Sequence, residues 1–418
     1  MSDDLKPTVI LGGGIIGLST AYYLALAEQD RKSQSAHAPT QGSIIVVDPS
    51  TAICSGASGQ NEGVIGTTGF KNEVEALAKL SYDLFAAIAS ENDGHERFGY
   101  SSLKIHAVFS HGYDPSNPKL PLPVVKQVEL SDLPKWLKPR STWQAGLISN
   151  GSDAAIVNPR KFCDFLKEEC ENLGVQLMLN STATKVHTEP DSLAFSSVDI
   201  QTKDDSSTIN VPCQNLVISA GSWSDRIFKS LFPSAEFHIP MTERQPAQSW
   251  LRRRETDKEK MGTDGKQVWL NPALEGQQDL HLSTSGYGVL FAAGSFADSD
   301  PPPPLPADVL PSPEEVEELK RLVSKYTHFG EHSQGLISSG RAYMSRTTND
   351  LPLIMKIPWK ELFPSVALSS APSRGGLFFN FGHYLDGFTL GPGSGKVLTA
   401  MIRGKKTSID TGPFTLFE

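Results

Sequence analysis

Short apolar runs on either side of a glycine-rich turn dominate the first fifty residues. The run 8–11 is typical of a buried strand, and residues 18–27 have the spacing of a buried helix. A second apolar strand, 43–47, ends at Asp48, and the polar stretch 28–42 before it is predicted to be a loop. This order of strand, glycine turn, helix, strand and acidic residue is that of a dinucleotide-binding βαβ unit.

The rest of the chain alternates helical and strand-like patterns. Helices are predicted at 73–90, 159–173, 314–326 and 396–403, and further buried strands at 176–179, 216–220 and 376–381. Residues 100–143 and 236–296 contain short apolar runs that are typical of a mainly antiparallel sheet, and the proline-dense segment 298–313 is expected to be an extended loop.

These patterns predict an α/β protein with a Rossmann-like cofactor domain and a second, mainly antiparallel β-sheet substrate domain. A chain of 418 residues is too long for one ordinary core. Because pieces of the dinucleotide fold lie at the start, middle and end of the chain, both domains are expected to be discontinuous. The predicted cofactor domain comprises 1–95, 150–232 and 335–418, and the predicted substrate domain comprises 96–149 and 233–334.

Charge and composition exclude several classes of protein. The net charge of −9 argues against a nucleic-acid binder. The one dense basic run, 252–254, is followed at once by acidic residues and is interpreted as a solvated loop. The four cysteines form no C-x-x-C pair and accompany no histidine cluster, so neither a metal site nor a disulfide framework is expected.

The uncharged stretch 8–27 is long enough to resemble a membrane span. Its glycines would break a helix near its start, and it lacks the basic region and cleavage site of a signal peptide. The C-terminus is not a peroxisomal S-K-L signal. These observations lead us to expect a cytoplasmic protein without a membrane span.

The turn after the first strand fits G-x-G-x-x-G, with Gly12, Gly14 and Gly17 around Ile15 and Ile16. Glycines there permit a tight turn, a close approach of the backbone to a pyrophosphate, and close packing of the helix on the strand. The helix N-terminus stabilises phosphate charge. Asp48 is placed to accept the ribose hydroxyls, although a plain turn residue before a proline is the alternative.

Four segments resemble those of the FAD-dependent amine oxidoreductases of the D-amino-acid oxidase and glycine oxidase type. Residues 54–65 resemble that family's second flavin segment, and 158–162 resemble a helix start. Residues 216–225 contain the A-G-x-W pattern, and 382–396 resemble the motif G-H-x-x-x-G-x-T-x-x-P-x-x-G-K. The resemblance covers the cofactor-binding parts well and the substrate domain poorly.

The resemblance implies non-covalent FAD, since relatives that tether the cofactor use a cysteine in the C-terminal half and none follows Cys213 here. It also implies a set of cofactor contacts: Ala57, Ser58, Asn61, Gly63 and Val64 along the pyrophosphate and flavin, Val186 by the adenine, Ala220, Gly221 and Trp223 beside the adenosine, and Gly382, His383, Gly387, Phe388 and Thr389 at the flavin ring. A helix after Gly393 would direct its N-terminus at the flavin ring.

The substrate site is where the sequence departs from the family pattern. Relatives carry R-P-x-T-x-D-x-x-P, whose arginine binds a substrate carboxylate. Here Arg346 lacks the following proline and stands one residue closer to Asp350. Arg346 therefore has two open interpretations, as a carboxylate ligand or as a structural arginine. Tyr343 and Tyr384 are candidate pocket walls, and His383 is a candidate base beside the flavin.

The leading hypothesis is oxidation of a primary or secondary amine or amino acid to an imine by hydride transfer to FAD. Oxygen or another acceptor would then take the electrons, so oxidase and dehydrogenase both stay open. Alternatives are a pathway-specific flavoenzyme acting on a non-amino-acid substrate, an FAD-bound interaction or trafficking protein, and an NAD-dependent dehydrogenase. No nucleic-acid partner is expected.

Overall fold

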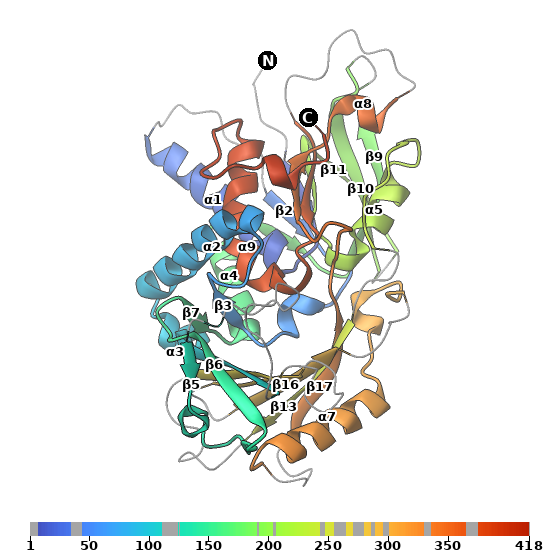
Figure 1. The fold of residues 1–418 in the computed structure, drawn as a ribbon. Coiled ribbons are helices and arrows are strands. Elements are labelled where there is room, and N and C mark those ends of the chain that lie inside the picture. The colour runs from blue at the N-terminus through green and yellow to red at the C-terminus, as the bar shows by residue number, and fades with distance from the viewer. Residues whose placement is uncertain are drawn as a thin grey trace.

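The computed structural model describes residues 7–34, 44–110, 124, 126–189, 192–203, 206–242, 247–254, 265–270, 280–285, 289–295, 301–329, 336–364 and 375–417. The predictions made for 35–43, for 296–300 and for parts of the 236–296 strand region lie outside the described residues. Both ends of the chain lie at the same end of the molecule (Figure 1).

A six-stranded sheet forms the centre of the cofactor-binding part, in the order β18-β19-β12-β1-β2-β8. Its strands are β1 Thr8–Leu11, β2 Ile44–Val47, β8 Gln176–Met178, β12 Asn215–Ile218, β18 Leu353–Lys356 and β19 Gly376–Phe381. All neighbours are parallel except β18 and β19. Because β1, β2 and β12 are buried on both faces, they are continuous apolar runs.

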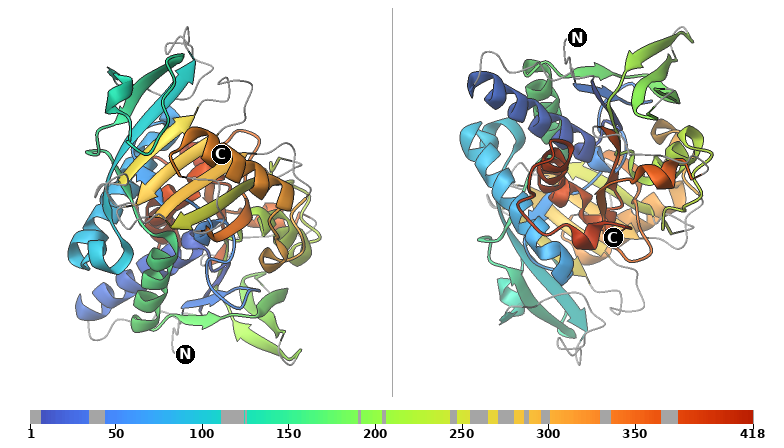
Figure 2. Two further views of the ribbon diagram at one scale, coloured as in Figure 1. Left: turned by 90° about the horizontal axis from the view of Figure 1, so that it is seen from below. Right: turned by 90° about the horizontal axis from the view of Figure 1, so that it is seen from above.

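Alternate residues of this sheet face two different layers. Ile10 and Val46 pack against one helical layer, while Val9 and Val47 pack on the opposite side. The helices of the first layer are α1 Ile15–Gln34, α2 Asn72–Glu91, α4 Pro159–Asn172 and α9 Gly387–Ile402, with the short α3 Gly94–Phe98 beside them. Figure 2, right, shows this helical layer from above.

The opposite layer combines a small antiparallel sheet with two helices. Its elements are β9 Ser181–Thr188, β10 Phe195–Thr202, β11 Thr208–Pro212, α5 Ser224–Leu231 and α8 Trp359–Leu362. The three strands were not predicted, because their polar and β-branched residues give only a weak period-two pattern.

A ten-stranded sheet forms the other end of the molecule. Its main order is β17-β13-β16-β15-β14-β4-β6-β5, and β3 and β7 pair at one side. The strands are β3 Val64–Gly66, β4 Ser101–Ser110, β5 Lys126–Val128, β6 Trp143–Ser149, β7 Ala154–Ile156, β13 Ala247–Arg254, β14 Gly265–Leu270, β15 Leu280–Ser285, β16 Val289–Ser295 and β17 Leu336–Tyr343. Helix α7, Pro313–Tyr326, covers its outer face (Figures 1 and 2).

The predicted fold class is confirmed, and three local predictions are wrong. Residues 28–34 continue helix α1 instead of forming a loop. The last helix begins at Gly387, not near residue 396, and contains Pro392. Residues 252–254 belong to strand β13 and not to a solvated loop, because cross-strand pairing with β16 and β17 satisfies their backbone.

The domain boundaries stay a prediction. Pairing of β17 with β13 groups residues 336–343 with the large sheet, although the predicted boundary at 335 assigned them to the cofactor domain. The uncharged stretch 8–27 is divided between β1 and α1. None of the described helices is long and apolar enough to cross a membrane.

Candidate functional site

A cavity of about 370 Å³ lies where the strands β1, β2 and β12 end, between the six-stranded sheet and the large sheet. The carboxyl ends of parallel strands are the usual ligand-binding edge of such sheets. The cavity lining comes from six stretches far apart in sequence and from two strands of the large sheet with the residues that follow one of them: residues 11–16, 47–61, 181–183, 219–230, 304–306, 380–388, 342–345 and Gln248, with gaps.

The glycine turn between β1 and α1 has no room for side chains. Gly12 has a φ of +118°, and a Cβ there would lie 2.5 Å from the Ser219 carbonyl oxygen. A Cβ on Gly17 would lie 2.0 Å from the Gly12 carbonyl oxygen. Gly17 therefore packs the helix onto the strand and does not line the cavity, whereas Gly12, Gly14, Ile15 and Ile16 do.

Asp48 lies at the end of β2, is buried, and lines the cavity. Its Oδ2 accepts a hydrogen bond from the Gly13 N–H at 2.7 Å, and its Oδ1 accepts one from the Ser50 N–H at 2.8 Å. These bonds hold the carboxylate beside the glycine turn. The position is that expected of a group that accepts ribose hydroxyls, because each carboxylate oxygen retains a further lone pair.

The segment after β2 is folded by its own side chains. Asn61 Nδ2 donates to the carbonyls of Ala57 at 3.1 Å and Ser58 at 2.7 Å, and its Oδ1 accepts from the Gly63 N–H. Ser58 Oγ accepts from the N–H of Ile15, at the start of α1. Ala57, Ser58 and Asn61 line the cavity, whereas Gly63 and the following Val64 do not.

The C-terminal motif also lines the cavity, with Gly382, His383, Tyr384, Gly387 and Phe388 in its wall. Because α9 begins at Gly387, its N-terminus, and not a helix start after Gly393, is at the cavity. The next residue, Thr389, points away from the cavity: its Oγ1 donates to the Val64 carbonyl at 3.1 Å.

His383 is buried, and its Nε2 lies 2.8 Å from Ser394 Oγ. Burial lowers the pKa of His383 to about 3, so its ring is neutral at neutral pH. An imidazole that is hydrogen-bonded to a serine and has such a low pKa is a poor general base. Burial raises the pKa of the nearby Asp386 to about 7.

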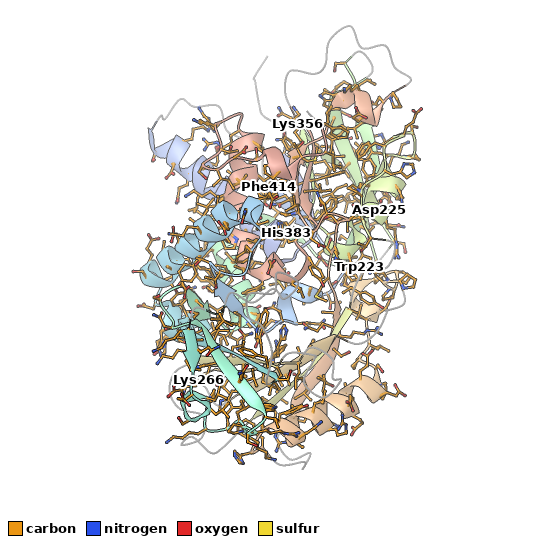
Figure 3. All side chains as sticks on the ribbon, in the orientation of Figure 1. Trp223, Asp225, Lys266, Lys356, His383 and Phe414 are labelled. Atoms are coloured by element: carbon orange, nitrogen blue, oxygen red, sulfur yellow. The ribbon has the colours of Figure 1, made fainter. Side chains whose placement is uncertain are left out.

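Trp223 closes the cavity at the end of β12, together with Ala220 and Gly221. The Trp223 Nε1–H donates to the Pro303 carbonyl at 2.7 Å, and Arg226 donates to the carbonyls of Pro302 and Pro303. The proline segment 301–306 therefore lies against this wall. Trp223 and His383, both labelled in Figure 3, line the same cavity.

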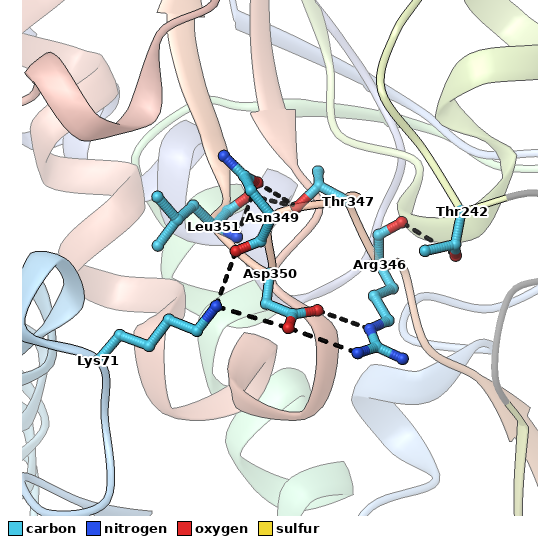
Figure 4. A network of polar contacts seen from close by, with 7 residues as sticks. All are labelled: Lys71, Thr242, Arg346, Thr347, Asn349, Asp350 and Leu351. Atoms are coloured by element: carbon cyan, nitrogen blue, oxygen red, sulfur yellow. Dashed lines mark hydrogen bonds and ion pairs between the residues drawn. The ribbon is translucent and has the colours of Figure 1, made fainter.

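Arg346 does not line the cavity, although Tyr343 and Tyr384 do. Its Nε donates to Asp350 Oδ1 at 2.6 Å, and Lys71 also contacts Asp350 (Figure 4). The Arg346 guanidinium lies 4.7 Å from the ring centre of Tyr384. The Asp350 partner raises the pKa of Arg346.

Sequence reasoning missed several residues of the cavity wall, and several of the cofactor contacts that it predicted do not line the cavity: Gly17, Gly63, Val64, Val186 and Thr389. Val186 is on β9, but the β9 residues in the wall are Ser181, Thr182 and Ala183. Nothing in the sequence marks these residues or 304–306, because only the packing of distant segments brings them to the cavity. The role of Val186 stays a prediction.

The cavity suits a dinucleotide with polar groups along its length. Ser50 Oγ, Ser222 Oγ and Asn380 Oδ1 are buried without a hydrogen-bond partner among the described residues, and all three residues line the cavity. Such groups are costly unless a ligand or water satisfies them. In the described part of the chain, no group of three or more His, Cys, Asp or Glu is placed to hold a metal ion.

The parallel sheet, the glycine turn at the helix start and the acidic end of β2 define a dinucleotide-binding protein with a second sheet over its ligand. The family model of FAD dependent oxidoreductases matches residues 8–401. The chain belongs to this family, and its cofactor is FAD.

Comparison with other proteins gives both sequence and structural relatives. A candidate oxidoreductase of Schizosaccharomyces pombe is 23% identical over 403 residues, covering 94% of this chain and 93% of that protein. Glycine oxidase from Geobacillus kaustophilus superposes with a TM-score of 0.73 at 17% identity over 99% of each chain. L-proline dehydrogenase from P. horikoshii superposes with a TM-score of 0.70 at 15% identity, over 96% of this chain and 95% of that one.

Proposed function

We propose that this FAD-dependent oxidoreductase oxidises a primary or secondary amine or an amino acid to an imine. Bound FAD would supply the two-electron acceptor for the carbon beside the amine. The substrate is a small molecule, and oxygen or another acceptor would reoxidise the cofactor. The glycine oxidase and proline dehydrogenase neighbours support this reaction class.

The observation that carries the proposal is the position of the cavity between the two sheets. One wall contains the glycine turn, Asp48 and the N-terminus of α9, while Gln248 and Tyr343 come from the large sheet. An extended dinucleotide would therefore present its ring end to the large sheet. A substrate held between ring and sheet would be oriented for transfer and shielded from water.

The protein's own groups fit an uncharged amine at this position. His383 is neutral because burial lowers its pKa to about 3, so it adds no positive charge that would repel a substrate amine or ammonium. The N-terminus of α9 directs its N–H groups towards the cavity, where negative charge develops on a reduced cofactor.

One observation argues against Arg346 as the ligand of a substrate carboxylate. Asp350 already occupies the guanidinium of Arg346, which lies outside the cavity wall. If Arg346 bound a substrate carboxylate, as the corresponding arginine of the family does, its ion pair with Asp350 would have to break.

Anaerobic addition of amines to the purified yellow protein tests the proposal. The panel pairs each amino acid with the amine that lacks its carboxylate: glycine with methylamine, alanine with ethylamine, and proline with pyrrolidine. Bleaching of the flavin absorption by at least one member supports amine oxidation. A protein that contains FAD but is not reduced by any amine in a broad panel would contradict it.

A further inference from the structure

Strand β13 presents three large side chains to the cofactor side of the ten-stranded sheet. Alternation along a strand places Gln248, Trp250 and Arg252 on one face, and Gln248 lines the cavity. On the other face, Leu251 packs with the core under α7 and Ser249 hydrogen-bonds to Glu315 of that helix. Figure 1 shows β13 between α7 and the cofactor-binding part.

Arg252 is a half-buried cation beside the flavin segment. Its Nη2 donates to the carbonyls of Asn61 at 3.0 Å and Gly59 at 3.5 Å. The guanidinium lies 4.6 Å from the ring centre of Trp250 and 5.5 Å from that of Phe291. Within the described chain no carboxylate forms an ion pair with Arg252, and burial lowers its pKa. Its other N–H groups are therefore available to an anion.

A row of directly paired residues leads across the same face from Arg252. Arg252 pairs with Phe291 on β16, Phe291 with Ser283 on β15, and Ser283 with Gln267 on β14. Directly paired residues share one face of a sheet. Three strand spacings of about 4.8 Å place the backbones of Arg252 and Gln267 roughly 14 Å apart, with the side chains of Phe291 and Ser283 between them on the same face.

Glu62 lies at the far end of this row. Gln267 Nε2 donates to Glu62 Oε2 at 2.7 Å, so the carboxyl reaches the sheet from the flavin segment. Glu62 Oε1 and Gln267 Oε1 are both buried and have no hydrogen-bond partner among the described residues. Gln267 is only 2% exposed. Two buried acceptors without a donor indicate a site for a ligand with N–H groups.

We propose that this row is the substrate site, with Arg252 binding an acidic group of the substrate and Glu62 accepting a proton from its amine. The assignment rests on the proposed amine oxidation and adds its substrate class, an amine that carries an acidic group. It replaces Arg346 as the carboxylate ligand by an arginine on a different strand. It gives a role to the basic run 252–254, which the sequence alone led us to treat as surface.

The proton transfer balances without any further reactant. The substrate ammonium loses one proton to the Glu62 carboxylate, which leaves a neutral amine and a carboxylic acid. Burial raises the pKa of Glu62 to about 7, which suits a group that exchanges protons near neutral pH. The Ser283 side chain already hydrogen-bonds to the Glu62 carboxyl, so the orphaned oxygen of Gln267 is the acceptor that remains for the amine.

The Arg252 end is tested with Arg252→Gln and Arg252→Lys in the FAD-bound protein. The matched control is Arg253→Gln, on the same strand and the opposite face. For the amino acid that reduces the flavin, Arg252→Gln is expected to raise KM at least tenfold, while the amine without the carboxylate changes less than twofold. Binding of anthranilate and aniline, measured by perturbation of the flavin spectrum, should show the same selectivity without turnover.

Two results would overturn the Arg252 assignment. The first is an equal effect of Arg252→Gln on acidic and non-acidic ligands. The second is a rise in the FAD dissociation constant as the sole change, since this would limit Arg252 to anchoring the flavin segment through Asn61. If no amine reduces the wild-type flavin, the proposed function fails. The anion site is then still tested by comparing the binding of anthranilate to the wild type with its binding to Arg252→Gln.

The Glu62 end is tested by Glu62→Gln, which keeps the size and the hydrogen bond to Gln267. The wild-type profile of kcat/KM against pH should rise through a pKa near 7, because the carboxylate must be ionised to accept the proton. In Glu62→Gln the rise of kcat/KM with pH should be absent. The rate of flavin reduction at pH 8 should be at least tenfold lower than in the wild type. An unchanged profile would exclude Glu62 as the proton acceptor.

Discussion

The two walls of the cavity are built by different means. The cofactor wall uses backbone: Gly12 in the wall leaves no room for a Cβ, Gly17 behind it packs α1 onto the turn, and the N-terminus of α9 is at the cavity edge. The wall from the large sheet uses side chains: Gln248 and Tyr343 line the cavity, and Trp250 and Arg252 follow Gln248 on the same face of β13. A wall made of backbone tolerates few residue types, while a strand accepts almost any side chain on its face.

This contrast explains why one wall leaves a sequence motif and the other does not. Only glycine has a side chain small enough for the turn between β1 and α1, so its spacing is visible in the sequence. The substrate row from Arg252 to Gln267 depends on the register of four strands, β13 to β16, whose order in the sheet differs from their order in the chain. Substitution in each wall should therefore have different consequences.

The largest effect is expected from Gly17→Ala, in the helix that packs behind the cofactor wall. The new Cβ would lie 2.0 Å from the Gly12 carbonyl oxygen, so the turn must move. We expect a loss of about 3 kcal/mol in stability and of most bound FAD, measured by thermal unfolding and by flavin absorbance of the purified protein. Gly412→Ala, where the nearest atom would be 3.4 Å away, is the control. Full FAD content in Gly17→Ala would contradict the backbone account.

The next effect is a loss of stability in acid that involves one buried histidine in each region. Burial lowers the pKa of His106, on β4, to about 4 and that of His383 to about 3. In the unfolded chain both protonate near 6.5, so between pH 6.5 and 4 the unfolded state binds more protons and stability falls as pH falls.

At pH 5 each histidine should cost about 2 kcal/mol relative to pH 7. The measurement is urea unfolding at both pH values, and His106→Asn and His383→Asn should each reduce the difference by about that amount. The exposed His328→Asn serves as control. Equal pH dependence in all three variants would show that other groups control acid stability.

A smaller effect is expected from loosening the proline segment 301–306, which lies against the cofactor wall. Arg226→Ala removes the hydrogen bonds to the carbonyls of Pro302 and Pro303 but leaves that of Trp223. Loss of these bonds should weaken FAD binding by about 1 kcal/mol, or roughly fivefold. Fluorescence titration of the apoprotein with FAD measures this change. An unaltered dissociation constant would show that the proline segment does not help to hold the cofactor.

The smallest effect is expected from Arg346→Ala. The Arg346 and Asp350 side chains are 38% and 30% exposed, so their ion pair should contribute about 0.5 kcal/mol. Thermal unfolding measures this change, and KM for an acidic substrate should stay within twofold of wild type. A large rise in KM, with Arg252→Gln unaffected, would return the carboxylate site to the position the family resemblance suggested.

The sequence by itself determined the cofactor wall and the class of protein. The glycine turn, Asp48, the segment around Asn61 and the motif from Gly382 each depend on local backbone geometry, which restricts the residue types at fixed spacing. The same local rules predicted most helices and buried strands, although they ended α1 too early and began α9 too late, because packing extends helices beyond their apolar spacing.

Only the tertiary structure decided what faces that cofactor wall. The basic run 252–254 has the composition of a surface loop, yet pairing with β16 and β17 places it inside a sheet, and Arg252 contacts the flavin segment. Arg346 is the arginine that best matches the family's carboxylate-binding motif, yet it is paired with Asp350 outside the cavity. Which side chains meet across a sheet depends on long-range strand pairing, and residues distant in the sequence carry no local signal of it.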